Sequence, residues 1–382
     1  MDTKIIHRRG TYEERDAYLE LINHVFAPED NSFFQNLLPK LYKPEDNPAY
    51  NAFITFEGDE MRAAVGVFPC EVRICGKTLK GVGVGNVAVH QEHRSRGFMK
   101  DLMNMAVDDM VANNVDFSFL GGQRQRYGYF SYDTAGSRFT FYITRTNIRH
   151  TYGKEPMKYE NIEIIDLAEN DNEALDGIMD IITKKPFYHV RSRERLYDIL
   201  KTWHSNPKIL KHEGKFIGYY IGNHIGEFGL VDDDYFESVI TTLVNNNGEL
   251  NITLPPFETK YISKLQPIAE GYKVEQGTCA TILCFERVID AYLTLKSTYT
   301  KLIDGEFTAL IHGRGGDENL TISVRDNKVT VEATDKTPDI ELNHFQAMSF
   351  FCLTGSCERY NGPAVADQWF PLPLWIHHVD DV

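Results

Sequence analysis

The stretch VAVHQEHRSRGFMKDLM, residues 87–103, joins an apolar run to an amphipathic run through a short basic turn, residues 90–97. From Phe98 to Val111 apolar residues recur at helical spacing, and the strand-like VDFSFL, residues 115–120, follows. The order predicts a strand, a turn, a helix and a second strand, which is a crossover unit of an α/β fold.

The basic turn has the features of an anion site. The first N–H groups of a helix lack intrahelical acceptors and carry partial positive charge. Gly97 permits close approach of a ligand to the main chain, and Arg94 and Arg96 can bind phosphate. The preceding strand could offer main-chain groups to an amide-bearing arm, and coenzyme A combines such an arm with a pyrophosphate. On the turn alone, a solvated basic helix start is the alternative.

Other nucleotide-binding loops are not indicated, because the sequence contains neither G-x-G-x-x-G nor G-x-x-x-x-G-K-S/T. The net charge of −15 argues against nucleic-acid or anionic-membrane partners. No apolar run approaches the roughly 18 residues of a membrane span, and the charged N-terminus is unlike a signal peptide. We therefore expect a cytoplasmic protein.

The six cysteines form three pairs with one spacing: Cys70 and Cys75, Cys279 and Cys284, Cys352 and Cys357. A five-residue step along a strand points two side chains to opposite faces, and zinc frameworks favour shorter spacings. We expect no metal, and reduced, mostly buried thiols.

The alternation of strands and helices begins again near Tyr159 and near Arg287, so the sequence predicts three domains, residues 1–150, 151–286 and 287–382. The middle domain has VDDDY, residues 231–235, where the first has its basic turn. Asp232, Asp233 and Asp234 are expected to cap the following helix and to repel phosphate.

Residues 87–103 with VDFSFL resemble the acetyl-CoA signature of GNAT N-acetyltransferases. The whole chain resembles the Eis-like (enhanced intracellular survival) branch of that superfamily. The stretch GGQRQRYGYF, residues 121–130, matches an aromatic and glycine-rich loop of the branch, a second GNAT-like unit lacks the cofactor turn, and residues 305–351 resemble a sterol-carrier-protein fold. The resemblance implies an α/β (α+β) fold with tandem GNAT-like mixed sheets flanked by helices, a C-terminal sterol-carrier-protein-like domain, and a homo-oligomer.

The resemblance also implies the residues that contact acetyl-CoA. Main-chain groups of Val87, Ala88 and Val89 would hold the pantetheine arm. The pyrophosphate would lie against Ser95, Arg96, Gly97, Phe98, Met99 and Lys100, beside Arg94. Phe119 and Leu120 would border the other side of the cofactor.

Catalysis departs from the branch at one position. The branch has a proton-donating tyrosine in a G-G-x-Y-x-R-F-G-Y stretch, and here Arg124 stands at that position while Tyr127 and Tyr129 match the later part. A guanidinium stays charged and can only steady negative charge, whereas a tyrosine, with a pKa of about 10, can protonate a thiolate. Tyr127, Tyr129, Tyr132 and water remain open as donors.

The resemblance gives the terminal carboxylate of Val382 the role of base in the first domain's active site. A free α-carboxyl has a pKa of about 3.3–3.7, so burial or nearby acids would have to raise it for efficient proton transfer. A solvated, frayed tail is the alternative.

The leading hypothesis is an acetyl-CoA-dependent N-acetyltransferase that acts on an amine, either a small cationic molecule or an amine of a peptide or protein. The acidity of the chain suits a cationic substrate. The alternative is a CoA- or lipid-binding protein with little or no transferase activity, which Arg124 keeps open.

Overall fold

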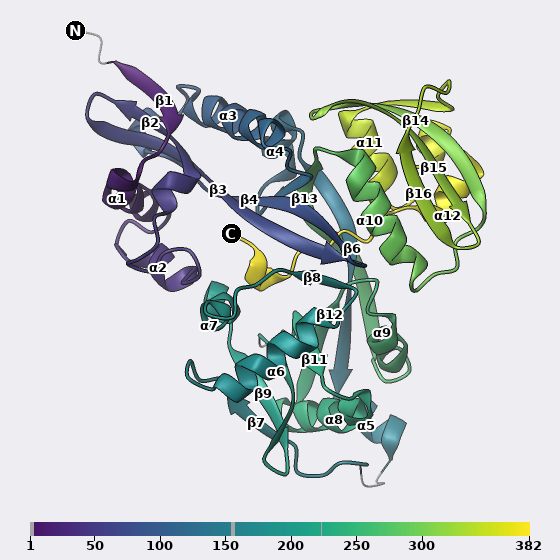
Figure 1. The fold of residues 1–382 in the computed structure, drawn as a ribbon. Coiled ribbons are helices and arrows are strands. Elements are labelled where there is room, and N and C mark those ends of the chain that lie inside the picture. Colours follow the sequence, from purple (N-terminus) through teal and green to yellow (C-terminus); the bar gives the residue numbers. More distant parts are fainter. Residues whose placement is uncertain (1–3, 154–156, 223) are drawn as a thin grey trace. The chain divides into compact units, whose positions relative to one another are not determined.

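The computed structural model describes residues 4–153, 157–222 and 224–382 and consists of mixed sheets flanked by helices (Figure 1). This confirms the predicted α/β fold class. Two compact units are formed: unit 1 contains residues 1–135, 278–374 and 381–382, and unit 2 contains residues 136–277 and 375–380. The division into three domains stays a prediction, as does the sterol-carrier-protein likeness.

The first sheet of unit 1 has the strand order β1, β2, β3, β4, β5, β13, in which β4 and β5 run parallel and the other neighbours antiparallel. Its strands are β1 (Ile5–Arg9), β2 (Ala52–Glu57), β3 (Glu60–Ile74), β4 (Lys77–Val89), β5 (Phe117–Leu120) and the last residues of β13 (Gly271–Ile282). The parallel pair follows from the crossover unit predicted around residues 87–120, because the helix between the strands returns the chain to the same end of the sheet.

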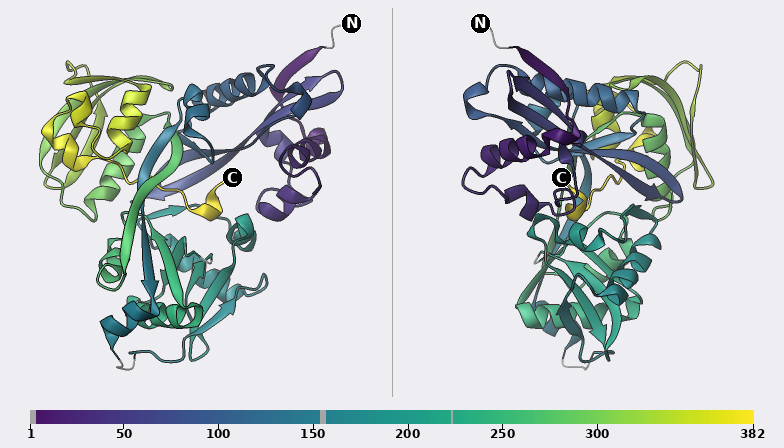
Figure 2. Two further views of the ribbon diagram at one scale, coloured as in Figure 1. Left: turned by 180° about the vertical axis from the view of Figure 1, so that it is seen from behind. Right: turned by 60° about the vertical axis from the view of Figure 1, so that its left-hand side comes forward.

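Helices cover both faces of this sheet (Figure 2). The apolar stripe of α3 (Phe98–Ala112) packs on Val65, Val67, Val82 and Val84. The residues of these strands that alternate with the four valines face α1 (Arg15–Phe26). Gly66 is one of them, and a Cβ added there would lie 3.0 Å from the Tyr18 hydroxyl of α1. The short helices α2 (Phe33–Leu37) and α4 (Arg124–Tyr127) complete this part.

The second sheet of unit 1 has the order β16, β15, β14, β17. Its elements are α10 (Phe285–Ser297), β14 (Gly305–Gly313), β15 (Gly316–Arg325), β16 (Lys328–Ala333), β17 (Ile340–Asn343), α11 (His344–Cys352) and α12 (Ala364–Trp369). Buried rings of Phe307, Phe350, Phe351, Trp369 and Phe370 form its aromatic core, in which neighbouring rings lie edge to face or offset.

Unit 2 has a sheet of order β11, β10, β9, β7 and an antiparallel pair of β12 with β6. Its elements are the larger part of β6 (Asp133–Thr144), α5 (Arg145–Tyr152), β7 (Glu163–Asp166), α6 (Asn172–Thr183), β8 (Phe187–His189), α7 (Leu196–Lys201), β9 (Pro207–His212), β10 (Lys215–Ile221), β11 (Glu227–Leu230), α8 (Phe236–Asn247), β12 (Glu249–Leu254) and α9 (Thr259–Leu265). Two apolar clusters fill it, one around α8 and one around α6 and α7.

A buried ionic network fixes tail residue Asp380 within unit 2. Arg191 donates two hydrogen bonds to Glu227, at 2.8 and 2.7 Å, and two to Asp380, at 3.0 and 2.7 Å. Tyr219 adds a hydrogen bond to Glu227 at 2.7 Å. Burial alone would raise the pKa of both carboxyls, but Arg191 outweighs it and lowers the pKa of Glu227 to about 2.

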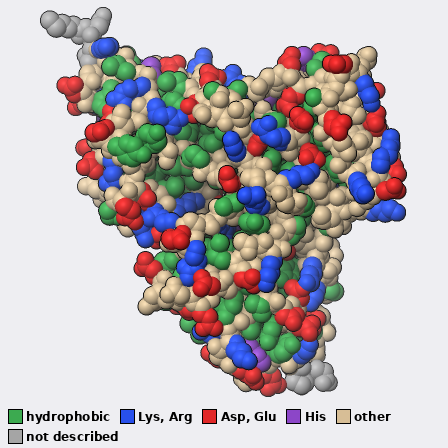
Figure 3. Space-filling model, in the orientation of Figure 1, with side chains coloured by type: hydrophobic (Ala, Val, Ile, Leu, Met, Phe, Trp, Pro, Cys, Tyr) green, Lys and Arg blue, Asp and Glu red, His purple; other side chains and the backbone are tan. Residues whose placement is uncertain are grey.

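Within the described residues no helix combines the length and the apolar character that crossing a membrane requires. The six cysteines are free thiols, of which Cys279, Cys352 and Cys357 are buried and the other three partly buried. On the face drawn in Figure 3, basic and acidic side chains are interspersed rather than segregated.

Candidate functional site

Strand β4 has an irregularity next to its last contact with β5. Between Ala64 and Gly66 the chain of β3 advances two residues, while β4 advances three, from Gly85 to Ala88. The extra residue forms a bulge at Asn86, whose φ of 51° lies in the left-handed region. Because β4 pairs with β5 only over residues 81–84, its edge over residues 85–89 has no partner strand on that side among the described residues.

The start of α3 also has unused main-chain donors. Gly97 is the N-cap, with a φ of 87°, and no side chain caps the helix. The first intrahelical bond runs from Asp101 N–H to the Gly97 carbonyl at 3.1 Å, so the N–H groups of Phe98, Met99 and Lys100 precede it. A Cβ added at Gly97 would approach only Asp101, at 3.8 Å, so the space before the helix is open.

The basic side chains of the turn differ in whether they already pair with a carboxylate. Arg96 donates two hydrogen bonds to Glu57, both at 2.8 Å, and one to His93 Nδ1 at 2.8 Å. The Arg96 bond lowers the pKa of Glu57. Arg94 and Lys100 are exposed and make no ion pair within the described residues, so they are available to an incoming phosphate, while Arg96 would have to share its charge with Glu57.

Coenzyme A fits these features. The open edge of β4 at Val87, Ala88 and Val89 suits the amides of an extended arm, and the uncapped start of α3 suits a pyrophosphate. Ala88 and Phe98 are buried, with 1% and 3% of their surface exposed, so only their main chains are available. Phe119 and Leu120 are buried in β5 opposite Gly83 and Val84.

The structure places Val382 on the same sheet. A Cβ added at Gly83 would lie 2.5 Å from Val382 Cγ2, and one at Gly85 would lie 3.0 Å from the carboxyl carbon of Val382. Lys40 Nζ donates to the Asp381 carbonyl at 2.7 Å, and Asp381 Oδ1 accepts from Val382 N–H at 2.9 Å. The two glycines therefore leave the space that the final residue occupies.

A buried polar group that the sequence analysis missed lies on the same face of the sheet. Tyr18 and Tyr42 donate to Asn86 Oδ1, Tyr18 at 3.4 Å. Asn86 Nδ2 is buried and has no hydrogen-bond partner in the described part of the chain. Burial raises the pKa of both tyrosines. Gly66, beside Tyr18, pairs with Gly85, beside Val382. An asparagine within the glycine-rich GVGVGNVAV was the available sequence signal.

The three tyrosines considered as proton donors have different environments. Tyr127 is 8% exposed, its ring packs where a Gly122 side chain would stand, and burial raises its pKa. Tyr129 is 86% exposed. Tyr132 is fully buried, and its hydroxyl is 2.7 Å from Ser118 Oγ.

Arg124 has a structural partner. It forms a two-point ion pair with the buried Asp133, in which Nη2 lies 3.0 Å from Oδ2, and this hydrogen bonding raises the pKa of Arg124. The residue therefore links the loop after β5 to the start of β6 and cannot donate a proton at neutral pH. The nearby Cys279 stays protonated, because burial first and then Asp133 raise its pKa to about 11.

In unit 2 Asp232 caps the 3-10 turn Asp233–Tyr235 and accepts from Asp234 N–H at 2.9 Å. The prediction that the acidic turn caps α8 itself was wrong, because α8 has Tyr235 as its N-cap and no side-chain cap. Lys185 Nζ donates to the Phe228 carbonyl of β11 at 3.1 Å and to Glu258 at 2.7 Å. This ammonium satisfies a main-chain acceptor of β11, the strand that precedes the acidic turn.

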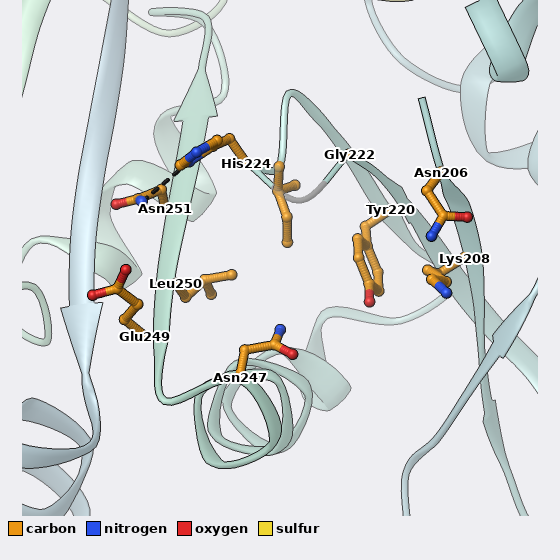
Figure 4. A pocket seen from close by; sticks show the side chains of 10 residues that line it. Asn206, Lys208, Tyr220, Gly222, His224, Asn247, Glu249, Leu250 and Asn251 are labelled. Atoms are coloured by element: carbon orange, nitrogen blue, oxygen red, sulfur yellow. Dashed lines mark hydrogen bonds between the residues drawn. The ribbon is translucent and has the colours of Figure 1, made fainter. Parts of the chain in front are cut away.

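Unit 2 also contains a polar hollow of about 410 Å³, into which Tyr220 and Asn247 face (Figure 4). A smaller hollow of about 260 Å³ shares His224 and Asn251 with it. None of the residues predicted to bind or react lines either hollow.

Comparison with known proteins concerns the domain and the fold. Residues 7–135 match the family model of the acetyltransferase (GNAT) domain. No curated protein matches the sequence. Across the whole chain the fold is similar to a GCN5-related N-acetyltransferase from Kribbella flavida, with a TM-score of 0.70, 13% identity, and coverage of 100% of this chain and 99% of that chain.

Two further solved structures have the same fold. A probable N-acyltransferase from Enterococcus faecalis has a TM-score of 0.69, 16% identity and 98% coverage of both chains. Eis1 from Mycobacterium abscessus has a TM-score of 0.64, 13% identity and 99% coverage of both chains. Together with the domain match, the fold supports an acyltransferase, and acyl-CoA is the donor that GNAT folds use.

Proposed function

We propose that the protein is an acetyl-CoA-dependent N-acetyltransferase whose acceptor is an amine. The observation that carries the proposal is the open edge of β4 followed, across the basic turn, by the uncapped start of α3. Both lie within the residues that match the GNAT domain. When bound, acetyl-CoA supplies a thioester that an amine can attack.

The first task of the chain is to hold the donor. The main chain of residues 87–89 pairs with the amide arm, and the N–H groups of residues 98–100 donate to the pyrophosphate. Arg94 and Lys100 add charge, and the φ of Gly97 turns the chain so that no side chain blocks the phosphates.

The base is the carboxyl group of Val382, which lies against Gly85 of β4. A carboxylate at this position attracts and orients an ammonium and accepts a proton from it. Lys40 and Asp381 fix its approach through main-chain hydrogen bonds.

The proton donor is Tyr127. A buried tyrosine with a raised pKa stays protonated at pH 7 and can protonate a departing thiolate. Tyr132 is less suited because its hydroxyl is bonded to Ser118, and Tyr129 is less suited because it is exposed.

The rest of the proposal concerns context. The acceptor is a small cationic amine or an amine of a peptide or protein, which the net charge of −15 would attract. The enzyme is cytoplasmic and homo-oligomeric, and residues 287–382 form a sterol-carrier-protein-like domain. Support for the homo-oligomer and for this domain comes from the sequence resemblance.

The test is thiol release from acetyl-CoA with and without a panel of polyamines, aminoglycosides and basic peptides. Amine-dependent release is expected. It should fall at least tenfold in Tyr127→Phe, with Tyr129→Phe as the matched control, and in a variant extended by a few residues after Val382. Acetyl-CoA affinity should stay near wild type in each.

A second candidate function is a CoA- or lipid-binding protein with little or no transfer, which is favoured by Arg124 and its pairing with Asp133. Stoichiometric acetyl-CoA binding without thiol release for any amine in the panel would favour this candidate over the enzyme.

A further inference from the structure

His90, Glu92 and His93 form a cluster of metal-ligating side chains just before α3. Each residue offers one ligand atom, and the three atoms lie within 4.8 Å of one another, which no other group of His, Cys, Asp and Glu does in the described part of the chain. All three lie on one tight turn, with His90 as the N-cap of the 3-10 helix Gln91–His93. Two imidazoles and a carboxylate are a ligand set for borderline divalent ions such as Zn²⁺.

The cluster contains a buried ring nitrogen whose capacity for a hydrogen bond is unfilled in the described part of the chain. His90 Nδ1 is buried and has no hydrogen-bond partner among the residues that the structure describes. The His90 ring is stacked on the His24 ring, with centroids 5.3 Å apart and planes at 15°. The stacking holds the imidazole plane in place, as a rigid ligand requires.

His93 has the outer partner that a metal-bound histidine usually has. Glu57 Oε2 lies 3.0 Å from His93 Nδ1. A carboxylate that accepts from one ring nitrogen orients the imidazole and leaves the other nitrogen, Nε2, for a metal. On binding, Nε2 gives up any proton it carries, and Nδ1 donates to Glu57 instead of accepting from Arg96.

The surrounding charge also permits a cation. Two guanidiniums lie near the cluster, but Arg62 is paired with Glu60 and Arg96 with Glu57. With Glu92 there are three carboxylates, and Arg94 of the same turn is a third guanidinium, so these groups sum to zero charge before an ion binds.

We infer that His90, Glu92 and His93 bind one divalent ion of the Zn²⁺ class, with water completing the coordination. The site lies on the basic turn, beside the proposed pyrophosphate site, and Arg96 contacts both. Its test contains no acyl-CoA, so failure of either proposal is distinguishable from failure of the other.

The experiment uses the full chain without an affinity tag. Co²⁺ is added as the spectroscopic probe, and Zn²⁺ is titrated by calorimetry. We expect visible d–d absorption of a low-coordinate Co²⁺ site, one ion per chain, and displacement of Co²⁺ by Zn²⁺. Absence of both the band and saturable Zn²⁺ binding overturns the inference.

Variants assign the ligands. His90→Gln, His93→Gln and Glu92→Gln should each weaken Zn²⁺ binding at least tenfold. Glu92 is exposed, so its variant does not endanger folding. Gln91→Ala, on the same turn and also exposed, is the matched control and should bind as wild type. His312→Gln tests the exposed histidine paired with Asp317 and Glu341, and loss of binding there, with retention in Glu92→Gln, overturns the assignment.

Discussion

At the scale of single residues, three glycines determine what can approach the sheet of unit 1. Gly83 and Gly85 leave the space that Val382 fills, and Gly97 begins α3 in a left-handed conformation. A side chain at Gly83 or Gly85 would clash with Val382, and a side chain at Gly97 would enter the space before the helix. Gly97 and Gly85 therefore give two separable tests.

Gly97→Glu should weaken acetyl-CoA binding more than tenfold, about 1.4 kcal/mol, because it places a negative side chain before the α3 N–H groups. Calorimetry measures the affinity. Gly76→Glu is the control, since Gly76 has a similar φ of 84° and nothing within 4 Å, so it introduces the same backbone strain elsewhere. Equal affinity in both variants would contradict the pyrophosphate assignment.

Gly85→Ala should lower turnover roughly tenfold, an increase of about 1.4 kcal/mol in the activation free energy, while acetyl-CoA affinity changes little. The new Cβ would lie 3.0 Å from the Val382 carboxyl carbon and displace it. Steady-state kinetics give the separation, and Gly128→Ala, where nothing lies within 4 Å, is the control. A wild-type turnover number would remove Val382 from the mechanism.

At the scale of elements, α11 is attached to the rest of unit 1 through a buried histidine. His344 Nδ1 accepts from Arg314 N–H at 3.0 Å, and Nε2 lies 3.1 Å from the Ser131 carbonyl and 3.0 Å from Thr281 Oγ1. These partners indicate a neutral ring with its proton on Nε2. Burial lowers the pKa of His344 to about 4.

The lowered pKa predicts a stability change in acid. Because the folded pKa of His344 lies below the unfolded value of about 6.5, its contribution is present above pH 6.5 and is lost as the pH falls toward 4. Between pH 7 and pH 5 the free energy of unfolding should fall by about 2 kcal/mol more in wild type than in His344→Gln. Urea unfolding at the two pH values measures this, and parallel losses would contradict it.

Elements with local signals were predictable from the sequence, and those set by distant residues were less so. The helical stripe predicted over residues 98–111 is α3, Phe98–Ala112. By contrast, the apolar and β-branched composition of CATILCFERV, residues 279–288, predicts a strand throughout, but β13 ends at Ile282 and α10 begins at Phe285. Glu318, from β15, accepts the N–H groups of Phe285 and Glu286, both at 2.8 Å, and so caps α10.

For the candidate site, the same distinction applies. The basic turn and Gly97 were visible because the ligand-binding groups are consecutive residues. Other contacts were not visible in the sequence, because their partners come from separate elements. They are the ion pairs Arg124–Asp133 and Arg96–Glu57 and the buried Tyr42–Asn86 hydrogen bond. The pattern of residues along the sequence does not indicate which distant carboxylate will form an ion pair with a given arginine.

At the scale of the whole molecule, the turns that precede α3 in unit 1 and α8 in unit 2 differ in charge. The turn before α3 is basic and the turn before α8 is acidic, and Lys185 already satisfies a main-chain acceptor of β11. One acetyl-CoA per chain is therefore expected by calorimetry. Two equivalent sites would show that the acidic turn does not exclude phosphate.

The two units also differ in continuity, which has a consequence for biosynthesis. Unit 2, except for residues 375–380, is one uninterrupted stretch, whereas unit 1 needs residues 278–374 to complete its sheets. On the ribosome, β5 must wait with an unpaired edge until β13 has emerged, and an open strand edge can pair with another chain. The second unit in the sequence can thus fold before the first, and nascent chains are most exposed to aggregation during the interval between synthesis of residues 120 and 282.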